Sequence, residues 1–152
     1  MPVDDEQPGD PIDILLVEPS PGDTRLFTES FRDGKLANCL HTVSDGESAI
    51  DFLHQRGGFA DAPRPNLVLL EPNLPATGGR DVLSALKNEP ALSDIPVTVL
   101  TSSDVGEDIA RSHGIEADHY IQKPIEPDEF IAFVQSVEDF WLAIIEEPVA
   151  DD

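Results

Sequence analysis

Basic residues are scarce in this sequence of 152 residues, which has nine Lys and Arg against 31 Asp and Glu. The formal net charge of -22 repels phosphate backbones and anionic lipid surfaces. We therefore expect no nucleic acid and no membrane among its partners. Lysine occurs only as Lys35, Lys87 and Lys123, and the acidic residues are spread along the chain. This pattern suits hydration in strong salt and favours a salt-loving source over a merely acidic cytosolic protein.

Cysteine is almost absent, because Cys39 is the only one. An intrachain disulfide and a cysteine metal cluster are thereby excluded, and we expect Cys39 to be a small buried residue beside a strand. No apolar run approaches the roughly 20 residues that span a bilayer. The first residues, MPVDDEQPGDP, are acidic and unlike a signal peptide. We predict a cytoplasmic protein whose residues 1–11 form a disordered acidic arm.

Short apolar runs recur along the chain and predict five strands. The run Leu67–Leu70 lies between Pro65 and Pro72 and is too short for a helix, so it predicts a central strand covered on both faces. The five predicted strands are Ile12–Val17, Asn38–Val43, Leu67–Leu70, Ile95–Leu100 and His119–Gln122.

Helical patterns follow the strands in turn. The first begins at Ser20, whose side chain can cap free N–H groups, with Pro21 at the first helical position. Other helices are predicted from Ser44–Glu47, from Thr77–Gly79 to near Pro90, from Asp104, and from Pro127 over about 18 residues. Strands alternating with helices predict a doubly wound α/β fold with a parallel sheet. The expected domain covers residues 12–145, followed by an acidic tail at 146–152.

Polar residues follow four of these strands directly. Glu18 and Glu71 follow the first and third, and Thr101 and Lys123 follow the fourth and fifth. The carboxyl ends of parallel strands meet at one edge of a sheet, where open α/β folds bind their ligands. Carboxylates suit a divalent cation, and a hydroxyl with an ammonium suits phosphoryl oxygens. The sequence therefore predicts a site for phosphoryl chemistry at this edge.

Several stretches around these residues resemble the receiver domain of two-component response regulators, and most closely the single-domain type related to the partners of bacterial phytochromes. They include ILLVEPSPGDTRL, PNLVLLEPNLPATGGRDVL and YIQKPIEPDEF, in the family's order. The resemblance implies a flavodoxin-like five-stranded sheet with strand order 2-1-3-4-5 and an extended C-terminal helix. It also implies a stand-alone, non-enzymatic signalling protein, and the acidic composition suggests a halophilic archaeon.

The resemblance also assigns roles to individual positions. Glu18 corresponds to the first acid of a magnesium-binding pair, and Asn73 would offer its backbone carbonyl to the metal. Glu71 occupies the position of the aspartate that accepts phosphate from a histidine kinase. The switch hydroxyl, the switch aromatic and the phosphate-sensing ammonium correspond to Thr101, Tyr120 and Lys123.

Two departures from the family pattern bear on phosphorylation. Pro19 stands where the second metal-binding acid belongs and has no side-chain oxygen, so magnesium binding should be weak or absent. Glu71 is longer than aspartate by one methylene, and a nucleophile displaced by roughly 1 Å can lose about 100-fold in rate. The longer side chain also brings its charge nearer to Lys123. A permanent ion pair between Glu71 and Lys123 could replace the regulated one.

Three interpretations of Glu71 follow: a built-in mimic of the phosphorylated state, an idle acid left by drift, or a working acceptor that uses Mg²⁺. The leading hypothesis is a receiver-like module that acts by protein–protein binding. Its expected partner is a sensor histidine kinase or another signalling protein, and a homodimer through the last helix near Trp141 is possible. A hydrolase or cofactor-binding protein on the same fold would need a nucleophile–base pair or a glycine-rich loop, and neither is visible.

Overall fold

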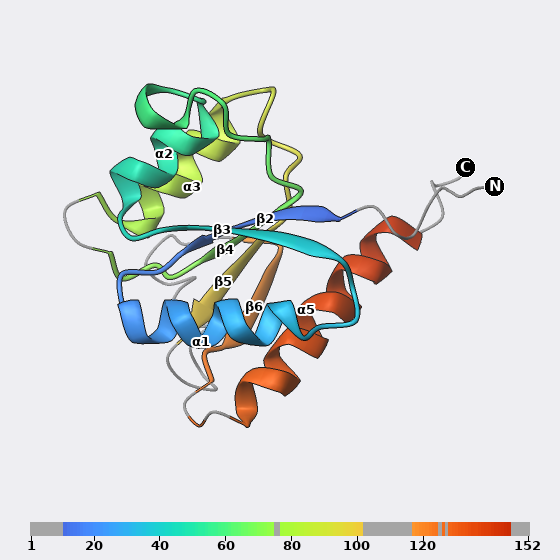
Figure 1. The fold of residues 1–152 in the computed structure, drawn as a ribbon. Helices are drawn as coiled ribbons and strands as arrows, with labels where there is room; N and C mark the ends of the chain where they lie inside the picture. The colour runs from blue at the N-terminus through green and yellow to red at the C-terminus, as the bar shows by residue number, and fades with distance from the viewer. Residues whose placement is uncertain (1–10, 75–76, 102–116, 125, 127, 147–152) are drawn as a thin grey trace.

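The computed structural model describes residues 11–74, 77–101, 117–124, 126 and 128–146 (Figure 1). Its centre is a five-stranded parallel sheet in the spatial order β3-β2-β4-β5-β6. Numbered along the chain, this is the predicted order 2-1-3-4-5. The strands are β2 (Ile12–Val17), β3 (Asn38–Val43), β4 (Leu67–Leu70), β5 (Val97–Thr101) and β6 (His119–Gln122).

Strand β4 is the buried centre of the sheet, as its apolar run predicts. All four of its residues are fully buried. Val17 of β2 pairs with Leu70 on one side of β4, and Val99 of β5 pairs with Leu70 on the other. The residues that follow β2, β4 and β5 are therefore brought to one edge of the sheet.

Helices cover both faces of the sheet, which confirms the doubly wound fold. Figure 1 shows α2 and α3 on one face and α1 and α5 on the other. Their bounds are α1 (Pro21–Arg32), α2 (Gly46–Leu53), α3 (Gly79–Asn88) and α5 (Glu129–Glu146), with a short 3₁₀ helix, η1, at Gly57–Phe59. Helix α5 has the predicted 18 residues. The helix expected from Asp104 lies outside the described residues, as do most of the expected arm and tail.

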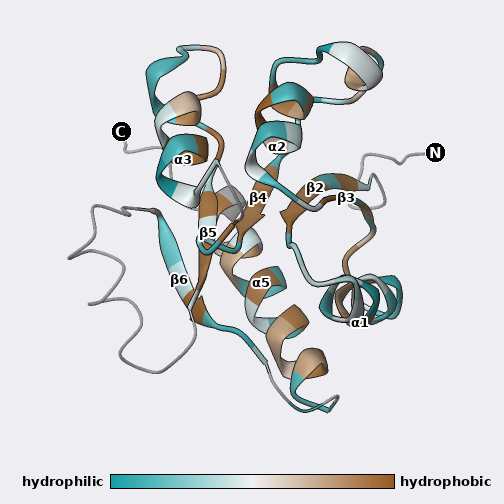
Figure 2. Ribbon diagram, turned by 90° about the vertical axis from the view of Figure 1, so that its left-hand side faces the viewer, coloured by the Kyte–Doolittle hydropathy of each residue, from teal (hydrophilic) through white to brown (hydrophobic). Residues whose placement is uncertain are grey.

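Two hydrophobic clusters lie between these layers. Leu15 and Val17 of β2 belong to the cluster under α2 and α3, whereas Ile14 and Leu16 belong to the cluster under α1 and α5. Successive side chains of a strand point to opposite faces, so one apolar run supplies both clusters. In Figure 2 the central strands β4 and β5 are brown between the helices, whereas the edge strand β6 and much of the outer surface of the helices are teal.

The predicted helix starts are confirmed at the first two helices. Ser20 Oγ accepts a hydrogen bond from the backbone N–H of Asp23 at 3.2 Å, and Pro21 is the first residue of α1. At α2, Asp45 Oδ1 accepts from the Ser48 N–H at 2.7 Å. Both caps place the start of a helix directly beyond the carboxyl end of a strand.

Two local predictions were wrong. The fourth strand begins at Val97 because the Ile95 N–H donates to the Leu92 carbonyl at 3.0 Å and closes a turn there. Cys39 lies within β3 and is exposed. Since β3 is an edge strand, the helices cover it less completely than they cover β4.

In the part of the chain that the structure describes, no helix combines the length and the apolar character needed to cross a membrane.

Gly46 lies at a close approach between α2 and the segment that leads into α3. A Cβ at this position would collide with the backbone carbonyl oxygen of Thr77 and lie 2.9 Å from its Cγ2. We expect Gly46→Ala to lower the free energy of unfolding by about 1–3 kcal/mol, measured by urea denaturation.

Gly22→Ala is the matched control for this change, because it also lies in the first turn of a helix. A Cβ there has nothing within 4 Å. The control should be neutral or slightly stabilising, since alanine favours helix over glycine. Equal stability of the two variants would show that the approach of Thr77 to Gly46 is not tight.

Candidate functional site

The polar residues at the carboxyl edge of the sheet are held by the backbone of the strands. The Glu18 N–H donates to the Val43 carbonyl at 3.0 Å, and the Glu71 N–H donates to the Val17 carbonyl at 3.0 Å. The Lys123 N–H donates to the Thr101 carbonyl at 2.8 Å. Each side chain therefore starts from a fixed position just beyond its strand.

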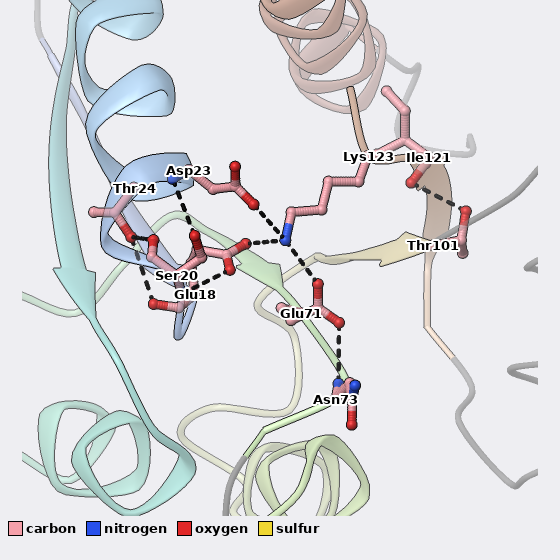
Figure 3. A network of polar contacts seen from close by, with 9 residues as sticks. All are labelled: Glu18, Ser20, Asp23, Thr24, Glu71, Asn73, Thr101, Ile121 and Lys123. Atoms are coloured by element: carbon pink, nitrogen blue, oxygen red, sulfur yellow. Dashed lines mark hydrogen bonds and ion pairs between the residues drawn. The ribbon is translucent and has the colours of Figure 1, made fainter. Parts of the chain in front are cut away.

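The Lys123 ammonium is the centre of this site (Figure 3). Its Nζ lies 2.8 Å from Glu18 Oε1 and 3.0 Å from Asp23 Oδ2. It also donates a hydrogen bond to Glu71 Oε1 at 3.1 Å. One cation thus contacts three carboxylates, including the two acids predicted to meet here.

Asp23, an acid in the first turn of α1, was missed by sequence reasoning. That position suggests a side chain that reaches back to the Ser20 N–H. In the structure the Ser20 N–H donates instead to Glu18 Oε2 at 3.0 Å. The Asp23 carboxylate is therefore available to Lys123. The signal for Asp23 in the sequence was its position in the first turn of the helix that follows the first strand.

Glu18 is a buried carboxylate, with its side chain fully shielded from solvent. Burial raises the pKa of Glu18 above its ordinary value of 4.5, because a charge loses hydration there. The contact with Lys123 and the N–H of Ser20 oppose this by stabilising the charged form, whereas the nearby charge of Glu71 adds to the rise.

Lys123 is also partly buried, with 20% of its side chain exposed. Burial alone would lower its pKa, but the contacts with Glu18, Asp23 and Glu71 outweigh that effect and raise the pKa well above the ordinary 10.5. The lysine is therefore fully charged at any physiological pH.

The other predicted site residues lie near this cluster, and one of them, Asn73, is hydrogen-bonded to it. Thr101 Oγ1 donates to the Ile121 carbonyl at 3.3 Å, and the Tyr120 hydroxyl accepts from the Ala117 N–H at 2.7 Å. The Asn73 N–H donates to Glu71 Oε2 at 3.1 Å. Figure 3 shows the Thr101 side chain directed at Ile121 and away from the Lys123 ammonium.

The arrangement does not fit the magnesium ion that the resemblance implies. Mg²⁺ requires a near-octahedral set of oxygens at about 2.0–2.1 Å. Here one oxygen of each of the three carboxylates is within 3.1 Å of an ammonium, and Pro19 supplies no side-chain oxygen. Across the described residues, no group of three or more His, Cys, Asp or Glu is arranged to hold a metal ion.

The doubly wound sheet and the acid-and-lysine cluster at its carboxyl edge define a receiver, a signalling domain of two-component systems. The chain belongs to the response regulator receiver domain family, whose sequence profile matches residues 14–135. The family and fold predicted from the sequence are thereby confirmed.

Individual relatives agree with this assignment. The chain is 39% identical over 137 residues to response regulator Rcp1 of Synechocystis sp., covering 90% of this chain and 93% of Rcp1. It is similar to the phosphorylated cyanobacterial phytochrome response regulator RcpA, with a TM-score of 0.77, 37% identity and coverage of 89% and 96%. It is also similar to the Mn²⁺-bound form of Rcp1, with a TM-score of 0.75, 38% identity and coverage of 93% and 100%.

Proposed function

We propose that this receiver acts by binding partner proteins in two-component signalling, without taking up phosphate, and that the ion pair between Glu71 and Lys123 fixes its state. The partner is a sensor histidine kinase or another signalling protein. The chain performs no turnover of its own. The supporting observation is the set of three carboxylates around the Lys123 ammonium.

The first argument concerns hydrogen-bond donors. An ammonium has three N–H groups and no further donor. Glu71 Oε1 accepts a hydrogen bond from Nζ at 3.1 Å, and oxygens of Glu18 and Asp23 lie 2.8 Å and 3.0 Å from Nζ as ion-pair partners. The lysine that would bind a phosphoryl group in this family therefore already has its partners. Phosphorylation would require at least one of these contacts to break.

The second argument concerns charge. Three carboxylates and one ammonium leave a formal charge of 1 - 3 = -2 on the cluster. A phosphoryl group carries about two negative charges near pH 7 and replaces the single charge of the carboxylate that it modifies, so the cluster would become more negative by about one charge. Without a bound divalent cation, repulsion opposes its entry into a site this close to buried acids. Pro19 has no side-chain oxygen and therefore supplies no ligand for such a cation.

The third argument concerns reach. Glu71 Oε1 lies 3.1 Å from Lys123 Nζ, so the longer side chain already provides a negative charge at the ammonium. This is the basis for interpreting Glu71 as a mimic of the phosphorylated state.

The excess of acidic over basic residues supports a cytoplasm of high salt concentration as the location of this protein. The experiments that test the proposal are therefore done at high salt.

The proposal is tested by intact mass after incubation with a small acyl-phosphate donor and Mg²⁺ at high salt. The natural chain and Glu71→Asp should gain no phosphoryl mass. Pro19→Asp combined with Glu71→Asp should gain one phosphoryl group, because it supplies both the second acid and the shorter acceptor.

Glu71→Gln is the matched control, since it keeps the length of the side chain and removes its charge. Uptake by the natural chain that is lost in Glu71→Gln would overturn the proposal and identify a glutamate phosphoacceptor. Failure of the double change to gain phosphate would show that more than these two positions disables the site.

A further inference from the structure

Strand β3 forms one edge of the sheet. It is the first strand in the order β3-β2-β4-β5-β6, and within the described part of the chain its strand partner is β2. In Figure 1, β3 runs across the view between α2 above it and α1 below it. An edge strand presents a row of backbone groups with which another strand can pair.

The hydrogen bonds from β2 show which backbone groups of β3 point outward. The Ile12 N–H donates to the Ala37 carbonyl at 3.1 Å. The Glu18 N–H donates to the Val43 carbonyl at 3.0 Å. The N–H and C=O groups of one strand residue point to the same side, and this side alternates along the strand. The odd-numbered residues of β3 therefore face β2. The residues whose N–H and C=O groups point away from the sheet are Asn38, Leu40 and Thr42.

This edge lacks the features by which natural sheets prevent further pairing. Protected edge strands are short, charged, interrupted by proline or bent by a bulge. Strand β3, with the sequence NCLHTV, carries no acid, lysine, arginine or proline, although 26% of the chain is charged. All six of its residues stay in register with β2. The opposite edge strand, β6, has four residues and is followed closely by Pro124.

Charge indicates that a second copy of this chain fits the β3 edge. Residues 21–43, from the start of α1 to the end of β3, contain three acidic and three basic residues. This segment is therefore neutral in a chain of net charge -22. Two copies repel one another less where neutral segments meet than where acids meet acids. A strongly basic partner would find no excess of acid in this segment to attract it.

Antiparallel pairing about a two-fold axis uses all of the outward groups. With the axis at Leu40, this residue lies opposite the partner's Leu40. Asn38 then lies opposite the partner's Thr42, and Thr42 opposite the partner's Asn38. Each such pair exchanges two N–H···O bonds, and hydrogen-bonded pairs recur at every second residue. The three outward residues of each copy thus supply six hydrogen bonds.

We propose that two copies of this receiver pair through their β3 edges, antiparallel, and join their five-stranded sheets into one continuous sheet. The interface is isologous, since the same strand serves both copies. It differs from the homodimer near Trp141, because Trp141 lies on α5. The pairing goes beyond the function proposed above and does not depend on the charge of Glu71.

The first test is sedimentation equilibrium at high salt over a series of protein concentrations. The natural chain should reach the mass of two chains. Thr42→Pro removes one outward N–H, and it breaks no bond to β2 because that N–H points away from the sheet. This change should raise the dimer dissociation constant at least about tenfold. Thr42→Val is the matched control, because it keeps the N–H and the branched side chain, and its dissociation constant should stay within about threefold.

Thr42→Lys is a second variant, which leaves the backbone unchanged. Thr42 is exposed, so the change preserves the fold. A lysine on an edge is a natural means of preventing strand pairing, and it should also weaken the dimer about tenfold. The added lysine lowers the net negative charge. Weaker pairing of this variant therefore cannot come from repulsion between acids.

The second test locates the interface by crosslinking. Cys39 is exposed and is the only cysteine of the chain, so a short bis-maleimide joins two chains through it. In the proposed register the two Cys39 Cα atoms lie roughly 8 Å apart. The control is Cys39→Ser combined with Ser84→Cys, since Ser84 is exposed on α3. Crosslinking of the natural chain should be at least about tenfold faster.

Three results would overturn the proposal. The first is a natural chain that stays monomeric at every concentration. The second is a dimer that Thr42→Pro or Thr42→Lys leaves as tight as Thr42→Val does; if Thr42→Pro does not fold, Thr42→Lys alone is compared. The third is equal crosslinking through Cys39 and through the cysteine on α3. Each of these results is independent of phosphate uptake, so the mass experiment on Glu71 tests the proposed function separately.

Discussion

Lys123→Met is expected to lower the free energy of unfolding by about 3 kcal/mol and the melting temperature by roughly 6–12 °C. The change leaves Glu18, Asp23 and Glu71 close together without the ammonium that contacts all three. Because the Glu18 side chain is fully shielded, water cannot replace the lost cation there. Urea denaturation at pH 7 and high salt measures the loss.

The effect should shrink as the pH falls. The raised pKa of Glu18 means that the folded state disfavours its charge, and this penalty disappears as pH falls through the folded pKa towards the ordinary 4.5. The contribution of Lys123 has the opposite origin. The folded state favours the charged form of Lys123, and the resulting stabilisation is present at every pH below the ordinary pKa of 10.5. This stabilisation is lost only as the pH rises through the raised pKa of Lys123 in the folded state. The difference in free energy of unfolding between the natural chain and Lys123→Met should therefore become smaller below about pH 5.

Lys87→Met is the matched control, because Lys87 is exposed on α3. It should change stability by no more than about 0.5 kcal/mol. If Lys123→Met were as stable as this control at pH 7, the carboxylates would not need a cation. The ion pair could then not fix the state of the receiver.

The architecture was predictable because its signals are local. Leu67–Leu70 is a continuous apolar run between prolines, and Ser20 and Pro21 specify a helix start by side-chain chemistry alone. The errors depend on contacts that the sequence does not display. The turn that closes at Leu92 shortens the fourth strand, and the edge position of β3 exposes Cys39.

The site was predictable in outline for a similar reason. Glu18, Glu71 and Lys123 follow strands, so the topology alone brings them to one edge. The role of Asp23 could not be read in this way, because it depends on whether Glu18 or Asp23 accepts from the Ser20 N–H. Which of these two carboxylates accepts the hydrogen bond depends on how β2, α1 and β6 pack together in the folded chain.

Phe27→Ala is expected to cost about 3–5 kcal/mol in unfolding free energy and roughly 6–20 °C in melting temperature. Phe27 is completely buried on α1. Its ring centroid lies 4.9 Å from that of Phe130 and 5.0 Å from that of Phe133, both on α5. Truncation leaves a cavity between the two helices, since backbone and neighbours can relax only partly. Urea denaturation at high salt measures the change.

This loss bears on function because α1 carries a residue of the ion cluster. Asp23, one turn before Phe27, contacts Lys123. Arg25→Ala is the control on the same helix. The Arg25 side chain is 81% exposed and pairs with the partly exposed Glu29, so its loss should cost no more than about 0.5 kcal/mol. If Phe27→Ala were no more costly than Arg25→Ala, α1 would not be anchored on α5 through Phe27. The position of Asp23 in the ion cluster would then depend on other contacts of α1.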